Sequence, residues 1–141
     1  MKKYTLNNAL NIIINDKIET ASERKINLHI NVDANDNLNF ISDYDIVVIF
    51  GNLLDNAIEA CSSSDIVNKV IHLNIKKCNN QLYFINISNP INKDTKHPKL
   101  NHEGLGLKNV QFSIEKYDGT MNIYSENEIF EVSIQLLSGK A

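Results

Sequence analysis

The sequence predicts an α+β protein, a two-layer α/β sandwich in which about three helices cover one face of a mixed, largely antiparallel sheet. Stretches whose apolar residues recur at helical spacing are interspersed with stretches in which apolar and polar residues alternate, as in strands with one buried face. Their order is helix, strand, helix, two strands, long loop, helix and two strands. A chain of 141 residues suits one domain.

Three segments have the apolar spacing of amphipathic helices. They span residues 6–24, 42–61 and 104–117. Ser42 or Asp43 is expected to be the N-cap of the second helix. Asp118-Gly119 is expected to end the third helix in the manner of a glycine C-cap.

Five segments alternate apolar and polar residues and are predicted to be strands. They span residues 26–32, 70–77, 82–88, 120–125 and 128–137. Asn79-Asn80 is expected to turn the second strand into the third, and Glu126-Asn127 the fourth into the fifth. Residues 89–101 have two prolines and no periodicity, and a loop of that length usually has a function or is disordered.

Composition limits the possible partners. The net charge is -3, the pI is about 5.8 and the basic residues are scattered, which argues against nucleic acid or an anionic membrane as the main partner. Two cysteines are too few for a disulfide framework, so both are expected to be reduced core or half-buried residues of a cytosolic protein. Neither a membrane span nor a signal peptide is predicted.

The second helix has a polar stripe on an otherwise apolar surface. Asn52, Asp55, Asn56 and Glu59 stand at positions i, i+3, i+4 and i+7, so their side chains share one face. The neutral amide oxygens suit a hard cation such as Mg²⁺, which keeps several waters and binds mainly to the phosphates that accompany it. The alternative is an ordinary solvated face, although asparagine is a poor helix former for that role.

The third helix begins with glycines directly after the long loop. Gly104 and Gly106 let a ligand approach the backbone closely, and the helix start offers unpaired N–H groups that suit phosphate. Glycine at a helix start after a loop is also common without a ligand. The segment is no P-loop, because the Gly-Lys-Ser/Thr ending is missing.

Taken in order, these motifs resemble the GHKL ATPases, and within them the catalytic domains of histidine kinases, which have the Bergerat fold. Residues 52–57 resemble the N box, and residues 104–107 the second glycine box. Residues 87–90 stand where the first glycine box is expected, and residues 119–125 resemble the strand after the second one. The strings at 51–60 and 104–110 are most similar to peptide-pheromone (quorum-sensing) receptor kinases of Gram-positive bacteria.

The resemblance implies a role for particular residues. Asn56 would ligate Mg²⁺, with Asn52 beside it, and Asn89 would accept a hydrogen bond from the adenine amino group of ATP. The backbone N–H groups expected at the phosphates belong to Gly104, Leu105, Gly106 and Leu107. Residues 92–101 would form the lid, from which Lys93, Lys96 or His102 would reach phosphate oxygens.

Four departures from the family pattern bear on activity. Asn89 replaces an aspartate, and the glycines of the first glycine box are absent, with Pro90 and Ile91 following Asn89 instead. Glu59 stands where many histidine kinases have a lysine, and the Gly-Thr/Ser-x-Phe pattern of the last hairpin is reduced to Phe130. ATP affinity is therefore expected to be modest, in the high micromolar range or weaker, about -5 to -6 kcal/mol. Asn52 occupies the position of the glutamate that activates water in hydrolysing relatives, so transfer to a protein nucleophile fits better than hydrolysis.

The first hypothesis is the catalytic half of a protein-histidine kinase, which binds Mg-ATP and passes the γ-phosphoryl to a histidine on a separate dimerisation domain. Residues 1–24 would end the connecting helix and 25–141 form the catalytic domain, a cytoplasmic and monomeric part of a membrane receptor that signals to a response regulator. His29 and His72 are expected on a sheet face, and His97 and His102 near the lid, so no phosphoacceptor is predicted. The alternatives are a degenerate nucleotide-binding regulatory module and, third, a protein-serine kinase acting as an anti-sigma factor.

Overall fold

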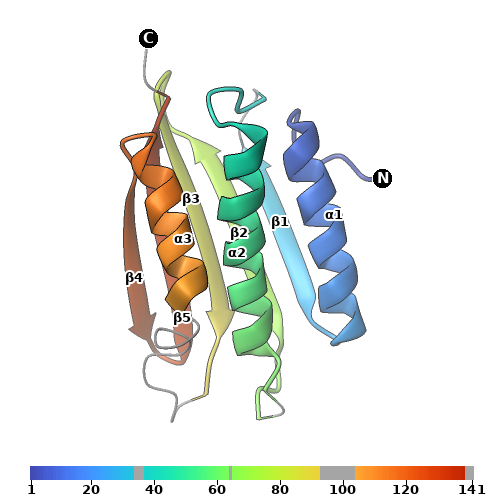
Figure 1. The fold of residues 1–141 in the computed structure, drawn as a ribbon. Helices are drawn as coiled ribbons and strands as arrows, with labels where there is room; N and C mark the ends of the chain where they lie inside the picture. The colour runs from blue at the N-terminus through green and yellow to red at the C-terminus, as the bar shows by residue number, and fades with distance from the viewer. Residues whose placement is uncertain (34–36, 64, 93–103, 139–141) are drawn as a thin grey trace.

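The structure is a computed structural model that describes residues 1–33, 37–63, 65–92 and 104–138. Three helices and five strands lie within those ranges (Figure 1). The helices are α1 (Asn8–Glu23), α2 (Asp43–Cys61) and α3 (Gly104–Glu115). The strands are β1 (Asn27–Asp33), β2 (Val70–Lys77), β3 (Leu82–Pro90), β4 (Thr120–Glu126) and β5 (Ile129–Leu137). None of the described helices is long and apolar enough to cross a membrane.

The five strands form one mixed sheet in the order β1-β2-β3-β5-β4. β1 and β2 pair in parallel, whereas the other three pairs are antiparallel. A parallel pair needs a crossover connection, and α2 provides it. All three helices cover the same face of the sheet, with α2 between α1 and α3 (Figure 1). The predicted fold class is confirmed.

Alternation along the strands and the wide apolar surface of α2 build the core. In β3, Tyr83, Ile85 and Ile87 are buried and the residues between them are only partly buried. Ten of the 19 residues of α2 are buried, because this helix packs against the sheet and both neighbouring helices. Ser42 is its N-cap, since its hydroxyl accepts a hydrogen bond from Asp45 N at 3.1 Å.

Several local expectations need correction. The turn between β4 and β5 is formed by Asn127 and Glu128, whose φ angles are 56° and 63°, one residue later than predicted. Two positive φ angles are those of a type I′ turn, which continues the twist of the paired strands. Cys61 is buried as expected, but Cys78 is exposed. β3 also extends to Pro90, so the following loop begins later than predicted.

The end of α3 is not a glycine C-cap. Asp118, with φ 53°, adopts the left-handed conformation, and its N–H donates to Glu115 O at 3.3 Å. Gly119 N donates to Ile114 O at 2.9 Å, which completes the hydrogen bonding of a Schellman motif. Gly119 is required for a different reason. A Cβ added there would lie 2.7 Å from both Ile114 O and Leu136 Cδ2.

We expect Gly119→Ala to lower the free energy of unfolding by about 1–3 kcal/mol, because the new methyl group overpacks the end of α3 against β5. Gly51→Ala is the matched control. A Cβ at this mid-helix position meets nothing within 4 Å, so the change should stabilise α2 by about 0.5–1 kcal/mol. Urea unfolding monitored by circular dichroism measures both. Equal stability of the two variants would contradict the packing described here.

Candidate functional site

The polar stripe of α2 and the start of α3 line one hollow of about 230 Å³. The side chains and backbone around it belong to Asn52, Asp55, Asn56, Glu59, Leu105, Gly106 and Asn109. All four predicted polar positions of α2 therefore border this hollow. The two segments are more than 40 residues apart in the sequence and form opposite walls of the same space.

Gly106 allows the two walls to approach each other closely. A Cβ at this position would lie 3.2 Å from Asn52 Oδ1, tighter than ordinary van der Waals contact. The orientation of the Asn52 amide is fixed, because its Nδ2 donates to Val48 O at 2.7 Å within α2. Its oxygen is the atom that faces the glycine. A residue larger than glycine at 106 would require the Asn52 side chain to shift by a few tenths of an ångström.

The donor groups of the hollow fit a cation that arrives with its own ligands. The Asn56 side chain makes no hydrogen bond to any described residue, so its amide oxygen is available to the hollow. Within the described ranges no group of three His, Cys, Asp or Glu side chains is placed to hold a metal ion. One or two protein oxygens with waters and phosphates completing the shell is the arrangement typical of Mg²⁺.

Other predicted residues lie in different surroundings. Leu107 packs its side chain into the core, so only its backbone is left for a ligand, and Gly104 is the first residue of α3. Lys93, Lys96 and His102, predicted to reach phosphate, lie outside the described residues. His97, predicted near the lid, lies outside them as well.

Asn89 is buried, with 3% of its surface exposed, and does not line the hollow between the helices. It borders a second hollow of about 300 Å³ at the end of β3, together with Ser88 and Pro90. Its Nδ2 donates to Pro90 O at 3.0 Å. No described residue donates to its side-chain oxygen, so this buried acceptor has no partner within the described part of the chain.

Sequence reasoning missed Asn109 as a member of the site. Its side chain lies three residues after Gly106 on the same face of α3, and that spacing is the signal that would have identified it. His29 and His72 were predicted on a sheet face, and this is confirmed. They are paired across β1 and β2, with ring centroids 5.2 Å apart and both side chains exposed.

The comparisons with known proteins decide the family. The GHKL domain family matches residues 41–137, which is more than half of the chain. The chain belongs to the GHKL domain family. No curated protein sequence matches it.

Solved structures with the fold of this GHKL domain include several histidine kinases. The catalytic domain of histidine kinase ThkA is 18% identical with a TM-score of 0.70, over 96% of this chain and 94% of that one. The histidine kinase domain of a blue-light activated kinase from Erythrobacter litoralis is 18% identical (TM-score 0.71), over 96% and 64%. Full-length ShkA in complex with AMPPNP is 14% identical (TM-score 0.66), over 94% and 30%. At these identities the likeness establishes a shared fold.

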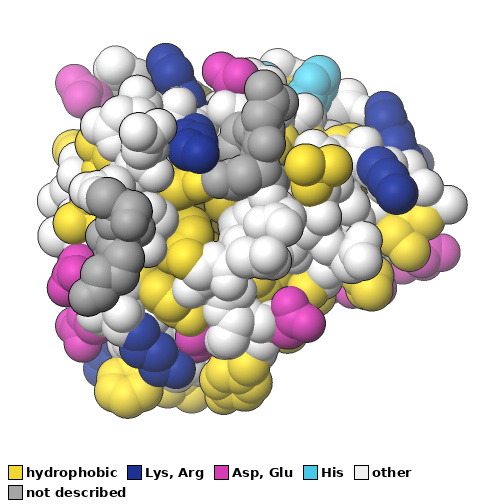
Figure 2. All heavy atoms as spheres, turned by 90° about the horizontal axis from the view of Figure 1, so that it is seen from above, with side chains coloured by type: hydrophobic (Ala, Val, Ile, Leu, Met, Phe, Trp, Pro, Cys, Tyr) yellow, Lys and Arg dark blue, Asp and Glu magenta, His cyan; other side chains and the backbone are white. Residues whose placement is uncertain are grey.

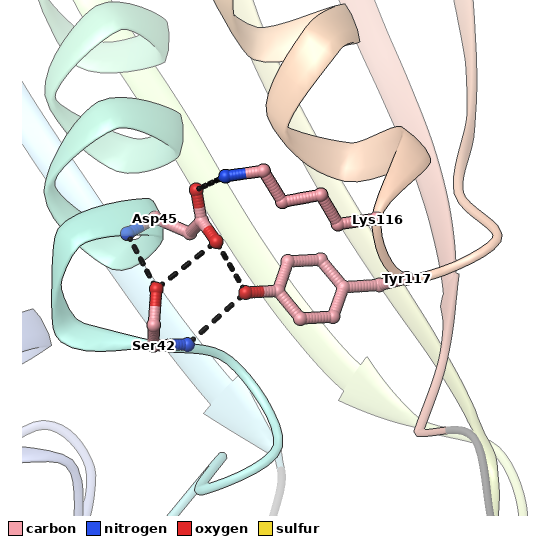
Figure 3. Close-up of polar contacts among 4 residues, drawn as sticks. All are labelled: Ser42, Asp45, Lys116 and Tyr117. Carbon is pink, nitrogen blue, oxygen red and sulfur yellow. Dashed lines mark hydrogen bonds and ion pairs between the residues drawn. The ribbon is translucent and has the colours of Figure 1, made fainter.

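A polar cluster around the buried carboxylate of Asp45 joins the start of α2 to the residues after α3, at the end opposite the hollow. Asp45 is 2% exposed, and its carboxylate accepts from Lys116 Nζ at 3.1 Å, from Ser42 Oγ at 3.0 Å and from the Tyr117 hydroxyl (Figure 3). Ser42 N in turn donates to the Tyr117 hydroxyl at 3.1 Å. The cluster fixes the start of α2 against the residues that follow α3. Charged side chains of both signs are scattered over the outside of this end (Figure 2).

Burial and hydrogen bonding act in opposite directions on the pKa of Asp45. Burial, the largest single cause, raises the pKa, but hydrogen bonds from Tyr117, Lys116 and Ser42 and the Lys116 charge outweigh it together. The net pKa lies below the ordinary value of 3.8. A carboxyl group with a lowered folded-state pKa stabilises the fold at every pH above its unfolded-state pKa. That stability is lost as the pH falls through the folded-state pKa.

We expect Asp45→Asn to destabilise the domain by about 2 kcal/mol at pH 7, because the Lys116 charge loses its buried partner. The same variant should lose less stability than the wild type when the pH is lowered below 4, since the titrating carboxyl group is gone. Urea unfolding between pH 3 and 7 measures both effects. Asp43→Asn, at an exposed position in the same helical turn, is the control and should change stability by less than about 0.5 kcal/mol. A D45N variant as stable as the wild type at pH 7 would contradict the role of the cluster.

Proposed function

We propose that the chain is the catalytic ATP-binding domain of a two-component sensor histidine kinase. In this proposal it binds Mg-ATP in the hollow between α2 and α3 and donates the γ-phosphoryl to a histidine on a separate dimerisation domain. The observation that carries the proposal is the shared hollow, in which the side-chain amides of α2 face the glycine-containing start of α3. The structure of full-length ShkA, which contains the same fold, was solved in complex with the nucleotide AMPPNP.

In this proposal, different groups around the hollow bind the metal ion and the phosphates. Asn56 provides an amide oxygen to Mg²⁺, and Asn52 lies beside it. The backbone N–H groups at the start of α3, from Gly104 to Leu107, face the phosphates at the positive end of the helix dipole. Bound Mg²⁺ supplies charge neutralisation on the transferring phosphoryl group. The chain itself contributes positioning, which is a major part of phosphoryl-transfer catalysis.

The finer assignments are also proposals. The strings at residues 51–60 and 104–110 support a receptor kinase of the peptide-pheromone type, with a response regulator downstream and the receptor in a membrane. Residues 1–24 are proposed to end the connecting helix, with the catalytic domain at 25–141. α1 packs Leu10 and Ile14 into the core, so this helix is part of the folded domain. The isolated domain is proposed to be a monomer.

The second candidate function is a regulatory module whose nucleotide site has degenerated. Glu59 supports it, because this carboxylate borders the hollow without an ion-pair partner among the described residues and repels a triphosphate. The amide at position 89 supports it as well. Binding of ATP separates the two functions. Mg²⁺-dependent binding favours the kinase, and its absence at millimolar ATP favours the module.

We expect calorimetry with a non-hydrolysable ATP analogue to show Mg²⁺-dependent binding by the wild type. Asn56→Ala should weaken it at least tenfold, because a metal ligand is removed. Asn74→Ala, on the helix-free face of the sheet, is the matched control and should bind like the wild type. If N56A binds as well as the wild type in Mg²⁺, the metal role of Asn56 is wrong.

Asn89→Asp tests the proposed adenine contact. A charged acceptor makes a stronger hydrogen bond to an amino group, so we expect the variant to bind the ATP analogue several-fold more tightly. The buried carboxylate has no described donor without ligand, so the ligand-free variant should also be less stable than the wild type. Calorimetry and thermal unfolding measure the two effects. Lower stability without tighter binding would exclude Asn89 from the adenine site.

A further inference from the structure

The hollow is poor in positive charge for a site that receives a polyanion. Its described lining has two carboxylates, Asp55 and Glu59, and no Lys or Arg. Two fixed negative charges in the lining repel a triphosphate and so lower the affinity of the site for it. Salt does not fully screen this repulsion at physiological ionic strength, where the Debye length is about 8 Å. A cation of the chain placed close to these carboxylates would therefore raise the affinity of the site for nucleotide.

One such cation comes from α1, which does not line the hollow. Lys17 Nζ lies 2.7 Å from Asp55 Oδ1, and the Lys17 side chain is only 16% exposed. The ammonium also lies 3.7 Å from Asp16 Oδ2 on its own helix. Most of the lysine is therefore covered, and its charge is directed at the α2 stripe. Asp55 itself is 61% exposed and keeps its contact with the hollow.

We infer that Lys17 is a positioning residue for nucleotide: it neutralises Asp55 at the rim of the hollow and so makes nucleotide affinity depend on the contact between α1 and α2. The inference rests on the proposed function. It adds a residue outside the glycine and asparagine motifs and assigns it an electrostatic role. Of the two carboxylates in the lining, Glu59 has no ion-pair partner among the described residues. Within that part of the chain, the pair of Lys17 with Asp55 is therefore what reduces the negative charge of the lining.

The same contact links α1 to the site. α1 is a 16-residue helix with a capped start, where Asn7 Oδ1 accepts from Leu10 N at 2.8 Å. Lys17 lies in the middle of α1, away from the helix ends, which are the parts that fray. Loss of this contact would leave the Asp55 charge unpaired beside the hollow. Loss of the Lys17–Asp55 ion pair should therefore lower nucleotide affinity without any change in the amide and backbone groups that face the nucleotide.

The test measures binding of Mg²⁺ with a non-hydrolysable ATP analogue to the full chain at 50 mM and 500 mM salt. We expect Lys17→Gln to weaken binding about three- to tenfold at low salt and less at high salt, because the exposed Asp55 charge is then unopposed. Asp55→Asn should bind as tightly as the wild type or more tightly. The K17Q/D55N double variant should return close to the wild-type affinity.

Lys76→Gln is the matched control, because it removes the same charge from an exposed position on the helix-free face of the sheet. It should leave the affinity unchanged. A purely structural ion pair predicts that K17Q and D55N weaken binding alike and that salt has no effect, and this outcome would overturn the inference. Wild-type affinity in K17Q would overturn it too. A wild type that does not bind the analogue in Mg²⁺ overturns the proposed function, and the inference with it.

Discussion

The position of α2 is the constraint on which the rest of the molecule depends. This helix packs against two other helices and the sheet, and ten of its 19 residues are buried, so a polar group on it must face either solvent or a hollow beside the helix. The polar stripe faces the hollow beside α3, and the lack of a side chain at Gly106 allows α3 to lie close to Asn52 of α2. The polar stripe of α2 and the glycine on the facing helix therefore act together. The stripe supplies the polar groups, and the glycine leaves space beside them.

The two ends of the α2–α3 pair are held by different chemistry. At one end the buried carboxylate of Asp45 accepts hydrogen bonds from Ser42, Lys116 and Tyr117. Such a network tolerates little change in the distance between the two helices. At the other end the contact between Gly106 and Asn52 is steric. Because the polar cluster fixes the distance between the helices, the hollow can keep its walls apart without side chains packed across it.

Most of the fold was predictable from the sequence because it rests on local patterns. Alternation marks β3 and β5, helical spacing marks α2, and Ser42 followed by Asp45 has the chemistry of an N-cap. The features that were not predicted join residues distant in the sequence. The contact of Lys17 with Asp55 has no periodicity to reveal it, nor has the cluster of Asp45 with Lys116. Asp118, rather than the glycine after it, takes the left-handed φ, because Gly119 is needed to fit beside Ile114.

Under the proposed function, the orientation of Asn52 favours transfer of the phosphoryl group over hydrolysis of ATP. Its amide nitrogen is occupied by Val48 O and its oxygen faces Gly106, so the side chain is fixed against the wall of the hollow. An amide in that position has no basic oxygen to accept a proton from water. Under the proposed function, the domain would hold Mg-ATP without providing a base for its hydrolysis. Phosphoryl transfer would then await a nucleophile brought by another domain, and the geometry of that encounter, rather than the chemistry of this hollow, would set the rate.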